Sequence, residues 1–269
     1  MNTIDICSKL EDATYLVNSF TGQEPMHPET SMGTGSGVAI NENGDILTAA
    51  HVVTGRLPVR EQDLNDPNVI ILARKKGEQF IQYYPVICGP AIDNETVKQP
   101  LTIDLALLRS ITRRKNIPYL RISSISIKVG TQVLMAGFPD DMGLPFEIDQ
   151  SLDRGNPEGQ SFFPCLQFAK HQLLMIKSRM IGHRTRFVQT DGKLTLEGEV
   201  FYVDNQIHSG ASGGPVVNRD GKVVGIITQR AITSVASKDY PDLKVPSGST
   251  VAISPRVIQP LIDQANSTR

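Results

Sequence analysis

The stretch Gly210-Ala211-Ser212-Gly213-Gly214-Pro215 places one serine among three glycines, immediately before an apolar run. Val216-Val217 and residues 223–228 flank Asn218-Arg219-Asp220-Gly221, a pattern that predicts an antiparallel hairpin. Glycines permit positive φ and let other groups approach the backbone closely. A serine in such a loop can share a small volume with backbone N–H groups, as acyl transfer requires. A plain glycine-rich turn stays the alternative until partners for this serine are found.

The length and charge of the chain bound its class. With 269 residues it suits one large all-β unit or two lobes with cores of their own. Lysine and arginine total 27, aspartate and glutamate total 28, and tryptophan is absent. Balanced charge and few aromatic residues argue against nucleic-acid binding and against a membrane-surface protein. We therefore expect neither a nucleic-acid nor a membrane partner.

Targeting signals and cysteines bear on the compartment. No run approaches the ~18 apolar residues of a membrane span, and the N-terminus lacks the pattern of a secretory signal. Cys7, Cys88 and Cys165 are odd in number and widely scattered, without the spacing of a metal site. Such cysteines are typical of reduced thiols in a reducing compartment. We expect a cytoplasmic protein, and the sequence suggests neither a metal nor a cofactor.

Short strand patterns separated by turns dominate the chain, which predicts an all-β barrel or sandwich fold. Residues 4–19 open as a helix and continue as a strand, and Ser254-Pro255 is a good start for a short C-terminal helix. Glu197-Gly198-Glu199 indicates a bulge or a turn, and residues 231–249 a polar loop. The stretch from about 110 to 128 is the best candidate for a crossing between two lobes.

Two further residues supply partners for Ser212. His51 follows Ala49-Ala50 at the end of a predicted strand, where small neighbours leave its imidazole open to approach. Asp104 precedes the apolar run 105–108, where a carboxylate is costly unless it is hydrogen-bonded. The chain order His, Asp, Ser is that of the chymotrypsin arrangement and differs from the subtilisin and α/β-hydrolase orders. Each residue alone has an ordinary structural reading; together they predict a base, an orienting carboxylate and a nucleophile.

The blocks around these residues resemble a known family. Thr48-Ala49-Ala50-His51-Val52-Val53, Asp104-Leu105-Ala106-Leu107-Leu108 and the 210–215 stretch look like the three signature blocks of trypsin-like serine proteases. Gly35-Ser36-Gly37-Val38 and residues 204–210 are similar to the HtrA-like subgroup. The resemblance covers roughly residues 15–262.

This resemblance implies a fold and a division into domains. The expected fold is all-β, with two six-stranded antiparallel barrels, a site in the cleft between them and a short C-terminal helix. We place the N-terminal lobe at residues 1–120, with His51 and Asp104. The C-terminal lobe then spans residues 121–269, with Ser212 and the terminal helix.

The resemblance also implies an activity, a serine endopeptidase that forms an acyl-enzyme on a protein or peptide substrate. Ser212 Oγ would attack the scissile carbonyl, and His51 would take its proton and return it to the leaving amine. Asp104 would hold the imidazole in its tautomer. The backbone N–H groups of Gly210 and Ser212 would bind the oxyanion, and neither a metal nor a cofactor is implied.

Substrate contacts are implied at Gln206, Ile207, His208, Thr228 and Arg230. Gln206 stands where trypsin has the aspartate of its pocket, which disfavours a basic P1 residue because no counter-charge is buried there. Ile207 would narrow the pocket and favour small or medium aliphatic P1 residues such as Val or Ala. An exposed loop histidine and a surface arginine are the plainer readings of His208 and Arg230.

The chain also departs from the family. HtrA-like proteases carry a PDZ domain after the protease, and residues 213–269 leave no room for one. Ala211 replaces the aspartate with which digestive relatives bind a newly cleaved N-terminus, so we do not expect that route of activation.

Two alternatives to an active endopeptidase stay open. One is a protease that is latent alone and switched on by a protein activator, with residues 139–165 or 231–249 as its gate. The other is a pseudoprotease that binds peptides. The oligomeric state is not predicted.

Overall fold

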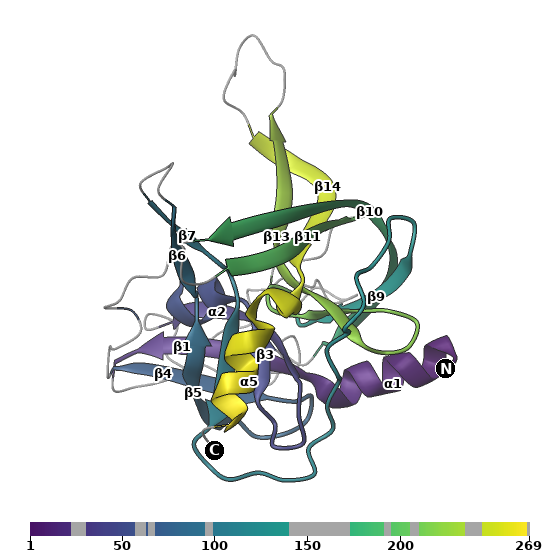
Figure 1. Ribbon diagram of the computed structural model, residues 1–269. Helices are drawn as coiled ribbons and strands as arrows, with labels where there is room; N and C mark the ends of the chain where they lie inside the picture. Colours follow the sequence, from purple (N-terminus) through teal and green to yellow (C-terminus); the bar gives the residue numbers. More distant parts are fainter. Residues whose placement is uncertain are drawn as a thin grey trace, which may run out of the picture.

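A computed structural model describes residues 1–22, 31–56, 63, 68–94, 99–139, 173–190, 195–204, 210–234 and 244–267. Within these ranges the chain forms two closed barrels of six antiparallel strands each (Figure 1). The predicted all-β, chymotrypsin-like fold with a short C-terminal helix is confirmed. The domain boundary at residue 120 stays a prediction.

The first barrel has the strand order β1-β2-β3-β8-β5-β4. Its strands are β1 (Thr14–Thr21), β2 (Ser31–Ala39), β3 (Ile46–Thr48), β4 (Val69–Arg74), β5 (Ile81–Cys88) and β8 (Ala106–Ser110). The short hairpin of β6 (Ala91–Asn94) and β7 (Gln99–Thr102) extends from it. Apolar and small side chains from these strands fill its interior, as alternation along each strand predicts. The helical turn that follows β3 adds further apolar side chains.

The second barrel has the strand order β10-β11-β14-β13-β12-β9. Its strands are β9 (Gln132–Gly137), β10 (Met175–Thr190), β11 (Thr195–Val203), β12 (Pro215–Val217), β13 (Val223–Ser234) and β14 (Lys244–Ile253). The predicted hairpin after Ser212 is β12–β13, and its turn is closed by the Gly221 N–H, which donates to the Asn218 carbonyl at 2.9 Å.

Helices lie at both ends of the described chain. Helix α1 (Thr3–Ala13) begins with a capping box in which the Asn2 side chain accepts from the Asp5 N–H at 2.8 Å. Its face with Ile6 and Leu10 is buried, and the chain passes straight into β1, as predicted. No helix among the described segments has the length and apolar character to span a bilayer.

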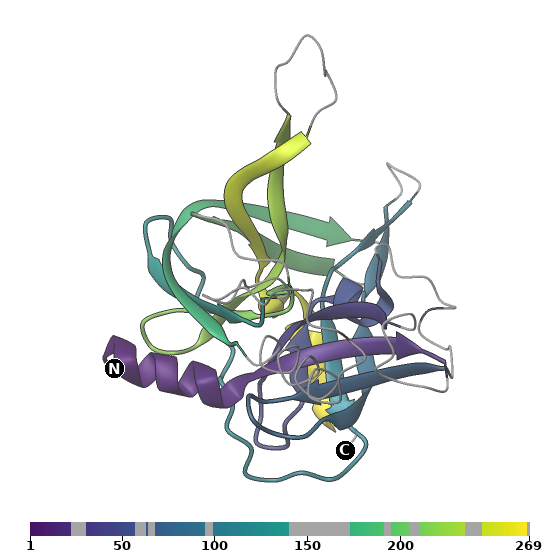
Figure 2. The ribbon, with the colours of Figure 1, turned by 180° about the vertical axis from the view of Figure 1, so that it is seen from behind.

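The C-terminal helix returns to the first barrel. A 3-10 turn (Pro255–Ile258) follows Ser254, and α5 (Gln259–Ser267) then runs across the first barrel (Figure 1). Arg109 of β8 donates to the Ala265 carbonyl at 3.2 Å. The view from behind shows α1 and α5 on different sides of the molecule (Figure 2).

One hydrophobic cluster joins the barrels. It combines Leu10 of α1 and Leu107 of β8 with Leu134 of β9, Ile226 of β13 and Ile258 near the C-terminus, all buried. The crossing between the barrels is also fixed, because the Val223 N–H donates to Arg121 O and the Ser123 N–H to Val223 O, at 2.9 and 2.8 Å. The barrels are therefore held in a fixed relation, which a site built from both requires.

Two element predictions were wrong. Residues 197–199 pair with Val188, Phe187 and Arg186 in unbroken register, so β11 has neither a bulge nor a turn there. Strand β13 continues to Ser234 and β14 begins at Lys244, so much of the predicted polar loop at 231–249 is a long hairpin. Gly198 misled the first prediction and polar composition the second, because both features are also found in turns and loops.

Candidate active site

His51 lies in a single helical turn, not at a strand end as the sequence predicted. Strand β3 ends at Thr48, and α2 (Ala50–Thr54) begins after Ala49. The turn closes through the Val52 N–H to Ala49 O and the Gly55 N–H to His51 O, at 3.2 and 2.8 Å. The imidazole is thereby carried on a short, hydrogen-bonded turn at the edge of the first barrel.

Asp104 holds His51 at two points. The His51 backbone N–H donates to one carboxylate oxygen at 3.0 Å, and His51 Nδ1 lies 2.9 Å from the other. The exposed fractions of the two side chains are 30% for His51 and 13% for Asp104. An ionised carboxylate only accepts hydrogen bonds, so this contact assigns the proton to Nδ1. In the neutral imidazole Nε2 is then the free acceptor.

The placement of Asp104 also explains why a carboxylate is tolerated in an apolar stretch. Its neighbours Ile103 and Leu105 are buried. The local turn is fixed by the Ile103 N–H to Pro90 O and the Gly89 N–H to Leu105 O, each at 2.9 Å. The two bonds from His51 then satisfy the carboxylate, as a polar group in such a setting requires.

The loop that carries Ser212, residues 210–215 and called the serine loop below, is held tightly against the first barrel. Gly210 and Gly213 have φ of 84° and 85°, which L side chains rarely adopt. A Cβ on Gly213 would also collide with Ser36 O of β2 and Thr48 Oγ1 of β3. The Gly213 N–H donates to Ile227 O at 2.7 Å, and the Gly214 N–H to Ala211 O at 2.9 Å. The loop therefore needs glycine at these positions.

The Ser212 hydroxyl faces Thr228 of β13. Its Oγ donates to the Thr228 carbonyl at 3.2 Å, and no hydrogen bond joins it to His51 within the described structure. The loop nevertheless lies beside α2, because the Gly35 Cβ position would be 2.5 Å from Val52 Cγ2 and 2.7 Å from Ser212 O. The structure thus joins His51 to Asp104 directly, and Gly35 of β2 lies close both to Ser212 and to Val52, the residue after His51.

Two backbone N–H groups at this loop have no hydrogen-bond acceptor among the described residues. Within the described part of the chain, neither the Gly210 N–H nor the Ser212 N–H donates a hydrogen bond, although Gly210 is buried. Ala211 between them is 1% exposed, and its Cβ would lie 2.8 Å from a Cβ on Gly137. A charged side chain at 211 would therefore be buried against the end of β9.

The predicted substrate contacts are only partly visible. Gln206, Ile207 and His208 lie outside the described residues, and so does the side chain of Arg230, whose backbone pairs with Thr250. Thr228 is 7% exposed, and its Oγ1 donates to Val251 O at 3.4 Å. Its carbonyl is the group that meets Ser212.

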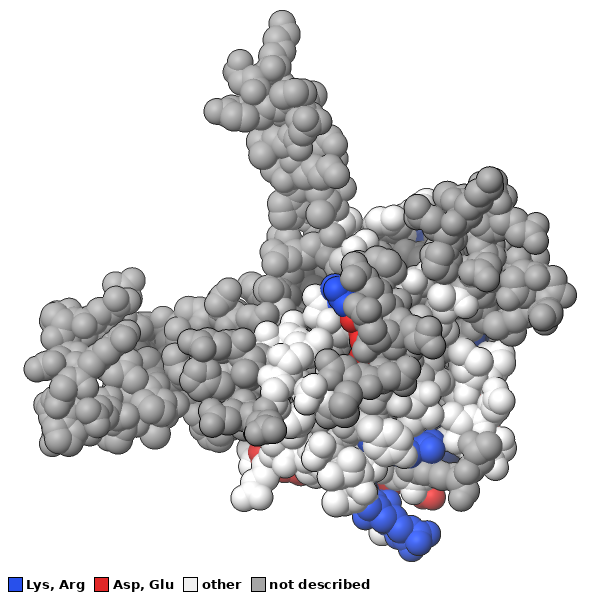
Figure 3. Space-filling view, turned by 90° about the vertical axis from the view of Figure 1, so that its left-hand side faces the viewer, with Lys and Arg blue, Asp and Glu red and all other residues white. Residues whose placement is uncertain are grey.

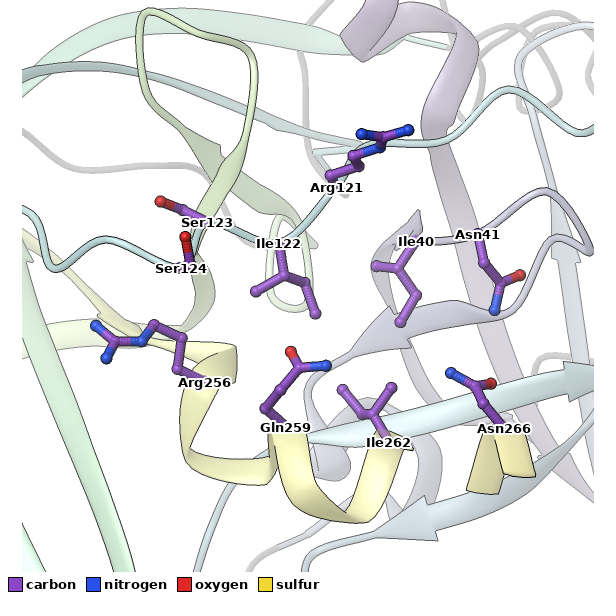
Figure 4. Close-up of a pocket in the computed structure, with 10 residues that line it drawn as sticks. All are labelled: Ile40, Asn41, Arg121, Ile122, Ser123, Ser124, Arg256, Gln259, Ile262 and Asn266. Carbon is purple, nitrogen blue, oxygen red and sulfur yellow. The ribbon is translucent and has the colours of Figure 1, made fainter. Parts of the chain in front are cut away.

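A pocket of about 410 Å³ lies away from these residues, between the crossing segment and the C-terminal helix (Figure 4). It is lined by Arg121, Ser123 and Ser124 of the crossing and by Gln259 and Ile262 of α5, among others. The Arg121 guanidinium points away from Gln259 in this view. The pocket contains none of the predicted catalytic residues, so it is not the predicted site.

The fold and these residues define a class. Two six-stranded antiparallel barrels, a His–Asp pair on the first and a serine in a glycine loop on the second, make up the chymotrypsin-like architecture. A family model described as the trypsin-like peptidase domain matches residues 35–226. The chain belongs to this family.

Curated relatives are similar at low identity. The mitochondrial serine protease HTRA2 of Drosophila willistoni is 29% identical over 203 residues, covering 75% of this chain and 35% of that protein. Serine protease HTRA1 of Xenopus laevis is 25% identical over 235 residues, covering 86% of this chain and 39% of that protein. The chain thus spans well under half the length of these relatives.

Solved structures share the fold. The HtrA-type protease AlgW, solved with a decapeptide, has a TM-score of 0.58 at 18% identity and covers 99% of this chain and 68% of its own. The active form of the Rv3671c protease from M. tuberculosis has a TM-score of 0.57 at 15% identity and covers 97% and 83%. At these identities the likeness concerns the fold alone.

Proposed function

We propose that this protein is a serine endopeptidase that cleaves peptide bonds through His51, Asp104 and Ser212. The observation that carries the proposal is the two-point contact of Asp104 with His51, at 2.9 and 3.0 Å, beside a serine loop braced on the same barrel. Membership of the trypsin-like peptidase domain family supports it.

The proposed chemistry follows from the assigned proton. With Nδ1–H bonded to Asp104, His51 Nε2 is the free base that takes the proton from Ser212 as Oγ attacks the scissile carbonyl. The carboxylate stabilises the imidazolium that forms, and His51 then protonates the leaving amine. The acyl group stays on Ser212 until water releases it.

The unengaged N–H groups of Gly210 and Ser212 support an oxyanion-binding role. A tetrahedral intermediate carries its negative charge on the former carbonyl oxygen, and preorganised N–H donors stabilise that charge. These donors belong to the backbone, so side-chain mutation cannot delete them. Their placement depends instead on the residues that hold the loop.

Specificity rests on the sequence around 206–208. We propose that Ile207 narrows the pocket, so that small or medium aliphatic P1 residues such as Val or Ala are preferred. Gln206 offers no charge to a basic P1 residue. Contacts from His208 and Arg230 to the substrate belong to the same proposal.

One observation favours a second candidate, a protease that is latent until a partner acts. The Ser212 hydroxyl is bonded to Thr228 O, not to His51. At 3.2 Å this O–H···O contact is longer than the usual 2.7–2.8 Å, so it adds at most about 1 kcal/mol. Rotation about one side-chain torsion would free the hydroxyl at little cost, and we therefore favour the active form.

Surface charge and cysteines inform the expected partners. On the described part of the face seen in Figure 3, basic and acidic side chains are scattered among uncharged ones. This mixture supports a peptide substrate over a polyanion. Cys7 and Cys88 are free thiols, which supports the proposal of a reducing, cytoplasmic location.

A peptide-library cleavage profile tests activity and P1 preference together. We expect cleavage after Val or Ala by the wild-type chain and none by Ser212→Ala. Equal cleavage by both would contradict the proposal, as would a preference for Lys or Arg at P1. Cleavage that appears only when a cell extract is added would favour the latent form, and saturable peptide binding without cleavage would favour a pseudoprotease.

A further inference from the structure

Ser36 of β2 is a buried polar residue with a hydrogen bond at each of its polar atoms. Its side chain is fully buried, in a strand between two glycines. Its Oγ donates to Gly210 O at 2.9 Å and accepts from the Phe138 N–H at 2.8 Å. Its N–H donates to Ser212 O at 2.7 Å, and its carbonyl accepts from Thr48 Oγ1 at 2.6 Å.

The direction of the hydroxyl bond is fixed by its neighbour. A hydroxyl has one proton to donate and two lone pairs. The Phe138 N–H has no accepting capacity and takes one lone pair, so the single O–H of Ser36 is committed to Gly210 O. This network reaches from the first barrel to the end of β9 and to the serine loop of the second barrel.

The two carbonyls that Ser36 binds belong to the two residues proposed as oxyanion donors. Gly210 O is held by the Ser36 hydroxyl, and Ser212 O by the Ser36 N–H. Holding the carbonyl of a residue restrains its ψ, and with it the place of its own N atom relative to the next peptide; the two held carbonyls also flank the Ala211–Ser212 peptide, which carries the Ser212 N–H. Gly210 has no side chain to restrict its torsions, so an external hold matters most there.

We propose that Ser36 is a positioning residue that holds the oxyanion donors of Gly210 and Ser212 in place for catalysis; this inference rests on the proposed peptidase function. Removing the hydroxyl would leave the Phe138 N–H and Gly210 O without a partner in a buried place, since Phe138 is 2% exposed. The Gly210–Ala211 peptide, which links the two donor residues, would then rotate toward another donor, and the Gly210 and Ser212 N atoms would lose their fixed spacing.

Tight packing supports a precise role for Ser36. A Cβ on Gly137 would lie 3.1 Å from Ser36 Oγ and 2.8 Å from the Ala211 Cα. The end of β9 therefore packs closely against both Ser36 and Ala211. A Cβ on Gly213 would collide with Ser36 O. Such close contact leaves the loop few alternative positions while the hydroxyl is present.

The first test compares Ser36→Ala with Ser123→Ala. Ser123 is a matched control, because it is 2% exposed and its hydroxyl also accepts a backbone N–H and donates to a carbonyl, both of Ile125, outside the site. We expect Ser36→Ala to lower kcat by roughly 10- to 100-fold with KM within about threefold, since one lost oxyanion donor costs about 10²–10³. Ser123→Ala should leave both unchanged.

A transition-state probe adds a readout that folding alone does not move. A peptide boronic acid forms a charged tetrahedral adduct on an active-site serine, so its affinity should fall in Ser36→Ala by the same factor as kcat/KM. The nearly isosteric Ser36→Cys keeps a weak S–H donor and should lie between wild type and Ser36→Ala. Equal losses in Ser36→Ala and Ser123→Ala would overturn the proposal.

A second measurement needs no turnover and separates this inference from the proposed function. In chains labelled with ¹⁵N-glycine and ¹⁵N-serine, we expect the amide signals of Gly210 and Ser212 to broaden or split in Ser36→Ala while that of Gly77 stays unchanged. Unaltered Gly210 and Ser212 signals would overturn the proposal. If wild type cleaves no peptide but these signals still change, the peptidase proposal fails and the positioning by Ser36 stands.

Discussion

At the scale of single residues, Asp104 fixes both the position and the tautomer of His51. One carboxylate oxygen takes the His51 backbone N–H and the other faces Nδ1, so the ring is aligned with the backbone that carries it. A carboxamide at this position could keep one acceptor but would present an NH₂ group to either Nδ1 or the backbone N–H. A carboxamide therefore cannot accept both hydrogen bonds that the Asp104 carboxylate accepts.

We predict that Asp104→Asn lowers kcat by about 10⁴-fold, the loss that follows when the orienting carboxylate of such a triad becomes an amide and the wrong tautomer is favoured. Steady-state kinetics on a peptide chosen from the library measures it. Asp263→Asn on α5 is the control, because this exposed carboxylate only accepts from Gln259. A loss of less than tenfold in Asp104→Asn would argue against the assigned role.

At the scale of elements, strand β11 is shaped by Gly198. A Cβ at this position would collide with the ring of Phe187 across the β10–β11 pair. The ring packs against the cluster that joins the barrels, so it uses the space that a side chain at 198 would fill. Gly198, which suggested a bulge, instead leaves the space that the Phe187 ring occupies.

We predict that Gly198→Ala destabilises the fold by roughly 1–3 kcal/mol, as overpacking of a filled site does. Urea unfolding measures this loss. Adding Phe187→Leu should return part of it, because the smaller side chain leaves room for the new methyl group. Strictly additive effects of the two substitutions would show that the ring and residue 198 do not compete for space.

Element types were predictable where the pattern was local. The α1–β1 passage follows from the spacing of Ile6, Leu10 and Ala13, all within a few residues, and the structure adds a cap from Asn2. The helical turn at His51 was missed, because Ala-His-Val-Val is as apolar and β-branched as the strand before it. Tertiary contacts decide such short segments, and periodicity cannot separate them.

At the scale of the whole molecule, the candidate site was predictable in part. The order and setting of His51, Asp104 and Ser212 predicted that the histidine and the aspartate act together. The structure contains a contact between these two residues, which are 53 positions apart in sequence. Ser36 was not predicted to act on the loop, because its partners Phe138 and Gly210 lie 102 and 174 residues away. The only sequence signal was a small polar residue between glycines in a buried strand.

The pH dependence of stability also belongs to the whole molecule. Burial raises the pKa of the Cys88 thiol from 9.0 to about 12, and burial raises the pKa of Tyr83 from 10.0 to about 12. Between these values the folded chain retains protons that the unfolded chain has lost, so stability falls as pH rises from about 9 to 12. The urea midpoint should decline over this range, and less steeply in Tyr83→Phe. A midpoint that stays constant from pH 9 to 12 would contradict this assignment.

The most direct measurement of the central claim is the mass of the intact protein after long incubation with excess fluorophosphonate, followed by peptide mapping. The account predicts one adduct per chain, located on Ser212, absent in Ser212→Ala and formed much more slowly in Asp104→Asn. No adduct on Ser212 in the wild-type chain, or the same modification in Ser212→Ala, would contradict it.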